Sequence, residues 1–156
     1  MPQLNRILSG LPRTTTLEFF ASFARFEYAL MYSGYLTARQ ARAVADWEKL
    51  TNELGNAFFA QVSAADRMPT LINDPPKKLI VRDDAARFGP PPAPVTTTAG
   101  LLAAARQVRN NLFHGNKMFA LNRERDIILM LEVLWLLDFM MERLPAVRLA
   151  FDEPQG

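Results

Sequence analysis

The sequence predicts an all-α fold: a four-helix bundle with a proline-rich irregular insertion between the second and third helices. Three observations support this prediction. Apolar residues recur at spacings of three and four in four separate stretches, which is the period of an α-helix. Threonine, glycine and proline stand at the ends of these stretches, where helices begin and stop. Most of the 11 prolines gather in one segment, residues 67–98, which differs in character from the rest.

The composition indicates a single globular domain spanning residues 1–156, because 49% of the residues are hydrophobic and 22% are charged. The chain contains no cysteine, which excludes disulfides, thiolate nucleophiles and cysteine-based metal sites. It contains one histidine, which excludes a histidine-rich metal site within one protomer. We therefore expect no metal and no other cofactor.

The net charge of +2 is too small to indicate nucleic-acid binding by bulk electrostatics, so contact with an anionic partner must be local. The first residues lack a basic region followed by an apolar one, so we expect no signal peptide. Glu132 and Asp138 interrupt the longest apolar stretch, residues 127–141, and a carboxylate in mid-bilayer is costly. We expect a cytoplasmic protein without membrane contact.

The first helix is expected at residues 16–35, after threonines that supply N-cap oxygens. On a helical wheel one broad arc is apolar, and it contains Phe19, Phe20, Phe23, Phe26, Leu30 and Met31. Glu27 lies near the middle of this arc. A carboxylate in an apolar arc must be paired, hydrogen-bonded or protonated.

The second helix is expected within residues 38–65. Apolar residues recur there at spacings of three and four, namely Trp47, Leu50, Leu54, Phe58 and Val62. Gly55 predicts a kink or a division into two shorter helices.

The insertion at residues 67–98 is a long connection, which is unusual inside a compact domain. Residues 79–81 predict one short strand or a docked extended piece. We favour a solvated loop for the segment as a whole, with a lid and a partner-binding arm as the alternatives.

The third helix is expected from residue 99 to near His114, with Gly115 as its stop. The fourth helix is expected at residues 122–144, with Pro145 closing it. It is apolar on almost all sides, which is typical of a helix buried on most sides. Because one protomer of this size offers little to cover it, we predict a dimer interface along this helix.

The stretch from Arg109 to Lys117 is the most informative for function, because it holds a guanidinium, amides, the only imidazole and a second cation. Arg109 and His114 are five residues apart, so an unbroken helix would point them about 140° from each other. Two arrangements bring them together. Either the helix loosens before Gly115, or Arg109 of one copy faces His114 of a second copy. Asn110 lies on the same helical face as His114.

Arg109 lies at the edge of the apolar arc of its helix, so we predict an ion pair with Glu27 that holds the guanidinium ready for a phosphate. An imidazole with an ordinary pKa of about 6.5 transfers protons near neutral pH. A guanidinium stabilises negative charge that builds on a phosphoryl oxygen. The two groups suffice for metal-free RNA cleavage, in which the 2′-hydroxyl of the RNA attacks the adjacent phosphate.

This stretch resembles the R-x4-6-H signature of the HEPN superfamily, here Arg109 and His114. Members typically place a polar residue directly after the arginine, here Asn110, and an aromatic-acidic pattern in the first helix, here residues 26–28. The resemblance covers residues 14–36 and 99–144, and it does not cover the proline-rich segment.

The resemblance implies a homodimeric four-helix bundle, with contacts through the fourth helix and the Arg109/His114 region. Many members are metal-independent endoribonucleases of toxin–antitoxin, phage-defence or RNA-processing systems, so RNA and an antitoxin or other protein are the expected partners. The implied catalytic residues are Arg109 and His114. Asn110 and Glu27 would support them, and the candidate phosphate contacts are Asn116 and Lys117.

The sequence departs from the HEPN pattern at one position, and alternatives are open for the function and for the roles of single residues. Members paired with a nucleotidyltransferase antitoxin often have a tyrosine where this chain has Asn116, which argues against regulation by modification there. A non-catalytic HEPN-like adaptor that binds RNA, a nucleotide or a protein is the alternative function, and a dimeric helical scaffold is a third. At the level of single residues, His114 is also a favourable helix C-terminal residue, and Arg109 also fits a purely structural pairing with Glu27.

Overall fold

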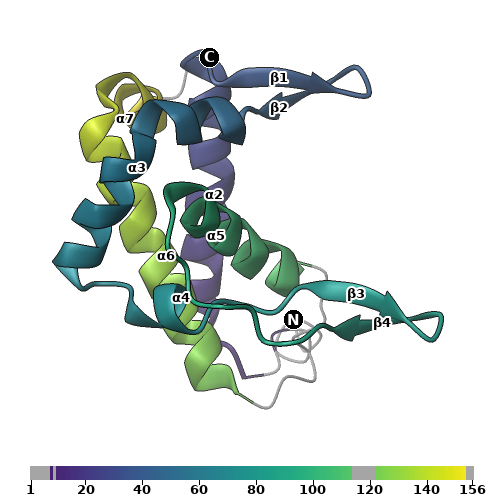
Figure 1. The fold of residues 1–156 in the computed structure, drawn as a ribbon. Helices are drawn as coiled ribbons and strands as arrows, with labels where there is room; N and C mark the ends of the chain where they lie inside the picture. Colours follow the sequence, from purple (N-terminus) through teal and green to yellow (C-terminus); the bar gives the residue numbers. More distant parts are fainter. Residues whose placement is uncertain (1–7, 9, 114–121, 154–156) are drawn as a thin grey trace.

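The computed structural model describes residues 8, 10–113 and 122–153. Within these ranges the chain forms six helices and two antiparallel hairpins (Figure 1). The helices are α2 (Arg13–Tyr32), α3 (Trp47–Ala65), α4 (Pro69–Asn73), α5 (Thr98–Phe113), α6 (Arg123–Arg143) and α7 (Pro145–Asp152). The hairpins are β1 (Leu36–Arg39) with β2 (Arg42–Ala45), and β3 (Leu79–Arg82) with β4 (Ala85–Phe88). The protein is mostly helical, but the prediction of a purely α-helical bundle is wrong because of the hairpins.

The core lies around α2, which packs against α6 and α7, while α3 packs against α5. The apolar arc predicted for the first helix is the face that α2 buries. Its fully buried members are Phe19, Phe23, Phe26 and Leu30. Burying one such side chain contributes about 1.5–3 kcal/mol, so this face accounts for much of the attachment of α2 to the domain.

The β1–β2 hairpin occupies residues that were expected to begin the second helix. The chain leaves α2 through Gly34, whose φ of +91° is a left-handed conformation that glycine adopts without strain. The hairpin then turns at Gln40 and Ala41, which both have positive φ, as in a type I′ turn. Such turns usually contain asparagine or glycine, so Gln40 and Ala41 carry no hairpin signal. The helix begins only at Trp47, where the Asp46 side chain caps it.

The predicted kink at Gly55 is confirmed. This residue breaks α3 with φ 67° and ψ 179°, a conformation that is strained for every residue except glycine. The buried hydroxyl of Thr98 fills the break, because it donates to the Gly55 carbonyl at 2.7 Å and accepts from the Phe59 amide at 3.2 Å. In an uninterrupted helix these two backbone groups would bond each other. Thr98, the first residue of α5, therefore joins the two parts of α3.

The proline-rich segment is more ordered than the solvated loop that we expected from its composition. The strand predicted at residues 79–81 is confirmed as part of β3, but its pairing with β4 was not predicted. The Val95 amide donates to the Ile72 carbonyl at 2.7 Å, and the Asn111 side chain donates to the Lys77 carbonyl at 2.9 Å. The first bond ties the end of the segment back to α4, which lies within the segment, and the second ties Lys77 to α5.

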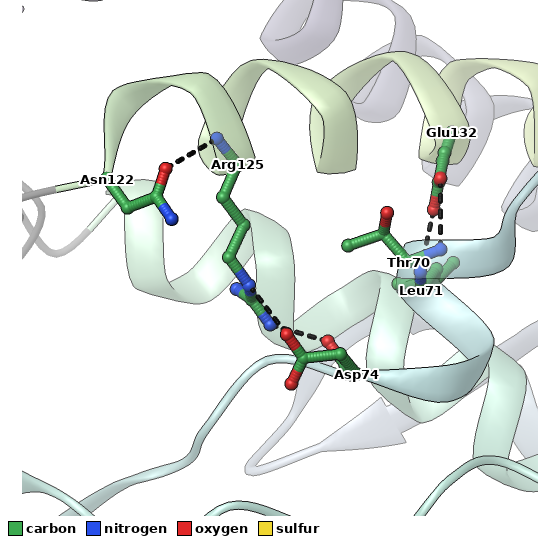
Figure 2. A network of polar contacts seen from close by, with 6 residues as sticks. All are labelled: Thr70, Leu71, Asp74, Asn122, Arg125 and Glu132. Carbon is green, nitrogen blue, oxygen red and sulfur yellow. Dashed lines mark hydrogen bonds and ion pairs between the residues drawn. The ribbon is translucent and has the colours of Figure 1, made fainter.

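A polar network attaches α4 to α6 (Figure 2). The carboxylate of Glu132, which is only 7% exposed, accepts hydrogen bonds from the backbone amides of Thr70 at 3.1 Å and Leu71 at 2.6 Å. At the other end of α4, the Arg125 guanidinium pairs with the Asp74 carboxylate at 3.1 Å. Glu132, which interrupts the apolar stretch, is thus hydrogen-bonded to backbone amides at the start of α4 that have no partner within that helix.

Pro145 closes α6 as predicted, but it also begins α7, which was not predicted. A proline suits the first position of a helix, since its φ is already helical and its missing N–H has no helical partner there. α7 buries Val147 and Ala150, and the Arg25 side chain of α2 donates to the Phe151 carbonyl at 2.9 Å.

Most of the apolar surface of α6 is covered by its own chain, through contacts with α2, α4, α5 and α7. Ile128 and Leu131 remain 41% and 51% exposed. None of the helices that the structure describes is long and apolar enough to cross a membrane.

Candidate functional site

The predicted pair between Glu27 and Arg109 is present. Arg109 Nη2 donates to Glu27 Oε1 at 3.1 Å, which joins α5 to α2. The two side chains are 25% exposed for Glu27 and 30% exposed for Arg109, so the expectation that both point into the interior is only partly met. The pair lies at the rim of the core, where part of the Arg109 side chain is open to solvent.

An aromatic ring provides the second constraint on Arg109. Its guanidinium carbon lies 5.1 Å from the ring centroid of Phe23, which is itself buried. A cation over an aromatic face gains about 0.5–1 kcal/mol at a partly exposed site. Phe23 and Glu27 are four residues apart on one face of α2, so a single helical face fixes the guanidinium from two directions.

Arg106 is a second guanidinium at this site, and it was not predicted as a site residue. Its guanidinium carbon lies 5.4 Å from the ring centroid of Trp47. The Trp47 and Phe23 rings are neighbours, with centroids 5.9 Å apart, so the two arginines rest on adjoining rings. The spacing of three residues between Arg106 and Arg109 was the available signal, because such residues share a helical face.

The charged groups at this site lie close enough to influence the pKa of Arg106. Burial lowers the pKa of the Arg106 guanidinium, and the positive charges of Arg109 and Arg39 lower it further, while Glu27 raises it. An arginine remains protonated in proteins under such influences. The site is therefore a group of permanent cations in which Glu27 is the carboxylate that acts on Arg106.

The two neighbouring amides have different positions. Asn110, the predicted supporting residue, is half-buried on α5 and is not brought into contact with Glu27 or Arg109 by any described bond. Asn111 is buried, accepts from Gln107 Nε2 at 2.7 Å and donates to the Lys77 carbonyl. Asn111 therefore anchors the proline-rich segment to the helix that carries Arg109.

The remaining predicted site residues, His114, Asn116 and Lys117, lie outside the described residues. The meeting of Arg109 with His114 stays a prediction. Among the residues that the structure does describe, no group of three or more histidine, aspartate or glutamate side chains could hold a metal ion.

The tyrosines of the first helix and the loop after it lie near Glu27 along the chain. Tyr28 and Tyr32 stack with ring centroids 5.8 Å apart, and the Arg25 guanidinium lies 5.0 Å from the Tyr28 centroid. Tyr32 is exposed, whereas Tyr35 is buried.

A comparison of the chain with family models, curated proteins and solved structures finds no match in any of the three.

Proposed function

We propose that the protein is a metal-independent endoribonuclease of the HEPN type that serves in a toxin–antitoxin or phage-defence system. The observation that carries this proposal is the fixed position of Arg109. Glu27 Oε1 lies 3.1 Å from Arg109 Nη2, and the Phe23 ring centroid lies 5.1 Å from the guanidinium carbon. Arg109 stands five residues before His114, the only histidine of the chain.

The proposed reaction needs one proton carrier and one anion-binding group. The 2′-hydroxyl of the RNA attacks the adjacent phosphorus, the bond to the 5′-oxygen breaks, and a 2′,3′-cyclic phosphate forms. His114 takes the proton of the attacking hydroxyl or supplies one to the departing oxygen. Arg109 stabilises the charge on the phosphoryl oxygens, with Glu27 as the residue that positions it.

A homodimer is part of the proposal, through α6 and the Arg109/His114 region. Ile128 and Leu131 lie one turn apart on α6 and are well exposed, which supports a contact between α6 and a second copy of the chain. Sedimentation of the purified protein tests this part, and a monomer at micromolar concentration would contradict it.

The cleavage assay uses wild type, His114→Ala and Arg109→Ala with total RNA in EDTA, followed by analysis of the RNA ends. Arg67→Ala is the matched control, because its guanidinium also lies over a ring, that of Trp135 at 5.7 Å, and it is exposed. We expect cyclic or 3′-phosphate ends with wild type and with the control only. Cleavage that survives in His114→Ala would overturn the proposal.

A different result supports the alternative function. If wild type cleaves no RNA but binds it, and Arg109→Ala abolishes that binding, the protein is a HEPN-like RNA-binding adaptor rather than a ribonuclease.

A further inference from the structure

The site around Arg109 holds more positive charge than its carboxylate can neutralise. Glu27 makes its described ion pair with Arg109. Arg106 lies one helical turn away on the adjoining ring, and the charges of Arg39 and Arg106 are close enough to act on each other. In a chain with a net charge of only +2, this is a marked local excess.

Several other arginines of the fold are paired. Arg125 binds Asp74, and Arg148 binds Asp138 at 3.1 Å and Asp152 at 2.9 Å. Within the described ranges, no carboxylate lies within ion-pair distance of Arg106, and the residue is exposed. Its packing on Trp47 holds the guanidinium in place while its N–H groups stay available to a ligand.

The β1–β2 hairpin carries further positive charge. Arg39 ends β1 and lies opposite Arg42, the first residue of β2, and residues 36–45 contain no acidic residue. Both arginines are exposed, and the hairpin extends away from the helical body (Figure 1). The charge of Arg39 acts on Arg106, so the hairpin makes the surroundings of Arg106 more favourable for an anion.

We propose that Arg106 forms a second phosphate-binding subsite beside Arg109, which holds a neighbouring phosphate of single-stranded RNA. This inference rests on the proposed function for the identity of the ligand. Arg106 and Arg109 are one turn apart, roughly 5–6 Å between their β-carbons, so one polyanionic strand contacts both. Arginine suits this role because its guanidinium binds phosphate through two parallel hydrogen bonds.

The test is a binding assay with a 2′-O-methyl RNA oligonucleotide, which has no free 2′-hydroxyl and cannot be cleaved by the proposed reaction. Fluorescence anisotropy gives the affinity of wild type, Arg106→Gln, Arg106→Lys and Arg39→Gln over a range of salt concentrations. Arg67→Gln is the control, since it removes an exposed guanidinium over a tryptophan ring elsewhere in the fold. Melting temperatures show that each variant is folded.

We expect Arg106→Gln to weaken binding about tenfold, the effect of losing one charge-assisted hydrogen bond, and Arg67→Gln to leave it unchanged. The slope of log affinity against log salt decreases in magnitude by about 0.7 for every phosphate of a single strand that the protein no longer neutralises. Arg106→Lys keeps that slope because it keeps the charge. Arg39→Gln lowers the affinity and the slope in the same direction.

Equal effects of Arg106→Gln and Arg67→Gln would overturn the inference, as would an unchanged salt slope in Arg106→Gln. Failure of wild type to bind the oligonucleotide at micromolar concentration would overturn it as well. The proposed nuclease activity is judged separately, by cleavage of unmodified RNA. If the protein binds RNA through Arg106 but does not cleave it, the second subsite is supported and the nuclease proposal is contradicted.

Discussion

Arg109 and Glu27 are 82 residues apart in the sequence and 3.1 Å apart in the structure. The bond joins α5 to α2 at the rim of the core, above the ring of Phe23. An ion pair in this half-exposed position contributes little to stability, because water competes for both charges. Its clearest consequence is that the guanidinium has one orientation.

Replacing Glu27 should therefore separate stability from function. We expect Glu27→Gln to lower the free energy of unfolding by only about 0.5–1 kcal/mol, measured by urea titration. The proposed RNA cleavage should fall roughly 10- to 100-fold, since in that proposal Arg109 is catalytic and a misplaced catalytic group costs far more than the ion pair itself. The loss should appear in kcat more than in KM. A large loss of stability with unchanged kcat per folded molecule would show that the pair is only structural.

Arg109→Lys tests whether charge alone is sufficient. A lysine is a point charge without the planar fork, and it stacks less well on Phe23. We expect the cleavage rate of Arg109→Lys to lie close to that of Arg109→Ala, with a melting temperature near that of wild type. Near-normal cleavage by the lysine variant would contradict the role given to the guanidinium geometry.

Thr98→Val tests the bridge across the break in α3. Valine has the shape of threonine but cannot bond the Gly55 carbonyl or the Phe59 amide, so two part-buried backbone groups lose their partner. We expect a loss of about 2–4 kcal/mol in unfolding free energy. The control Thr98→Ser keeps the hydroxyl and should lose only about 1 kcal/mol for the missing methyl group. Equal losses in the two variants would mean that the bridge does not stabilise α3.

Glu132→Gln tests the attachment of α4 to α6. The glutamine oxygen still accepts from one of the two backbone amides, of Thr70 or Leu71, but the glutamine NH2 group then faces the other amide and cannot accept from it. We expect a loss of about 1–3 kcal/mol, because one buried amide is left unpaired. Glu142→Gln on the same helix changes an exposed carboxylate and should have almost no effect. Urea titration of both variants provides the comparison.

Tyr35 predicts a pH dependence of stability. Burial raises the pKa of its hydroxyl above the usual 10.0, and the charge of Glu53 and a hydrogen bond to it raise the pKa further. A raised folded pKa means that Tyr35 contributes its full stabilisation below the unfolded pKa and loses it as the pH rises through the folded pKa. Wild type should therefore lose more stability than Tyr35→Phe in the interval above about pH 10, where the unfolded chain releases the proton first. A difference between the two proteins that stays constant over this interval would contradict the assignment.

The sequence by itself determined the approximate positions of the four long helices and which of their faces are apolar. The period of three and four depends on residues within a few turns of each other, so it identified α2, α5, α6 and most of α3. The same wheels placed Glu27 and Arg109 at apolar arcs, and opposite charges in such positions must find partners. Their pairing was therefore predictable without coordinates.

Only the tertiary structure decided the features that join distant segments. Thr98 is an ordinary helix start in the sequence, and its use in the break of α3 depends on how α3 packs on α5. Glu132 was visible as an interruption, but its partners lie at the start of α4, a helix of five residues without a clear period. The β1–β2 turn at Gln40 and Ala41 lacks the usual residues, so its neighbours must hold it. Arg106 joins the site because α5 lays it on Trp47, a contact between elements that local periodicity does not encode.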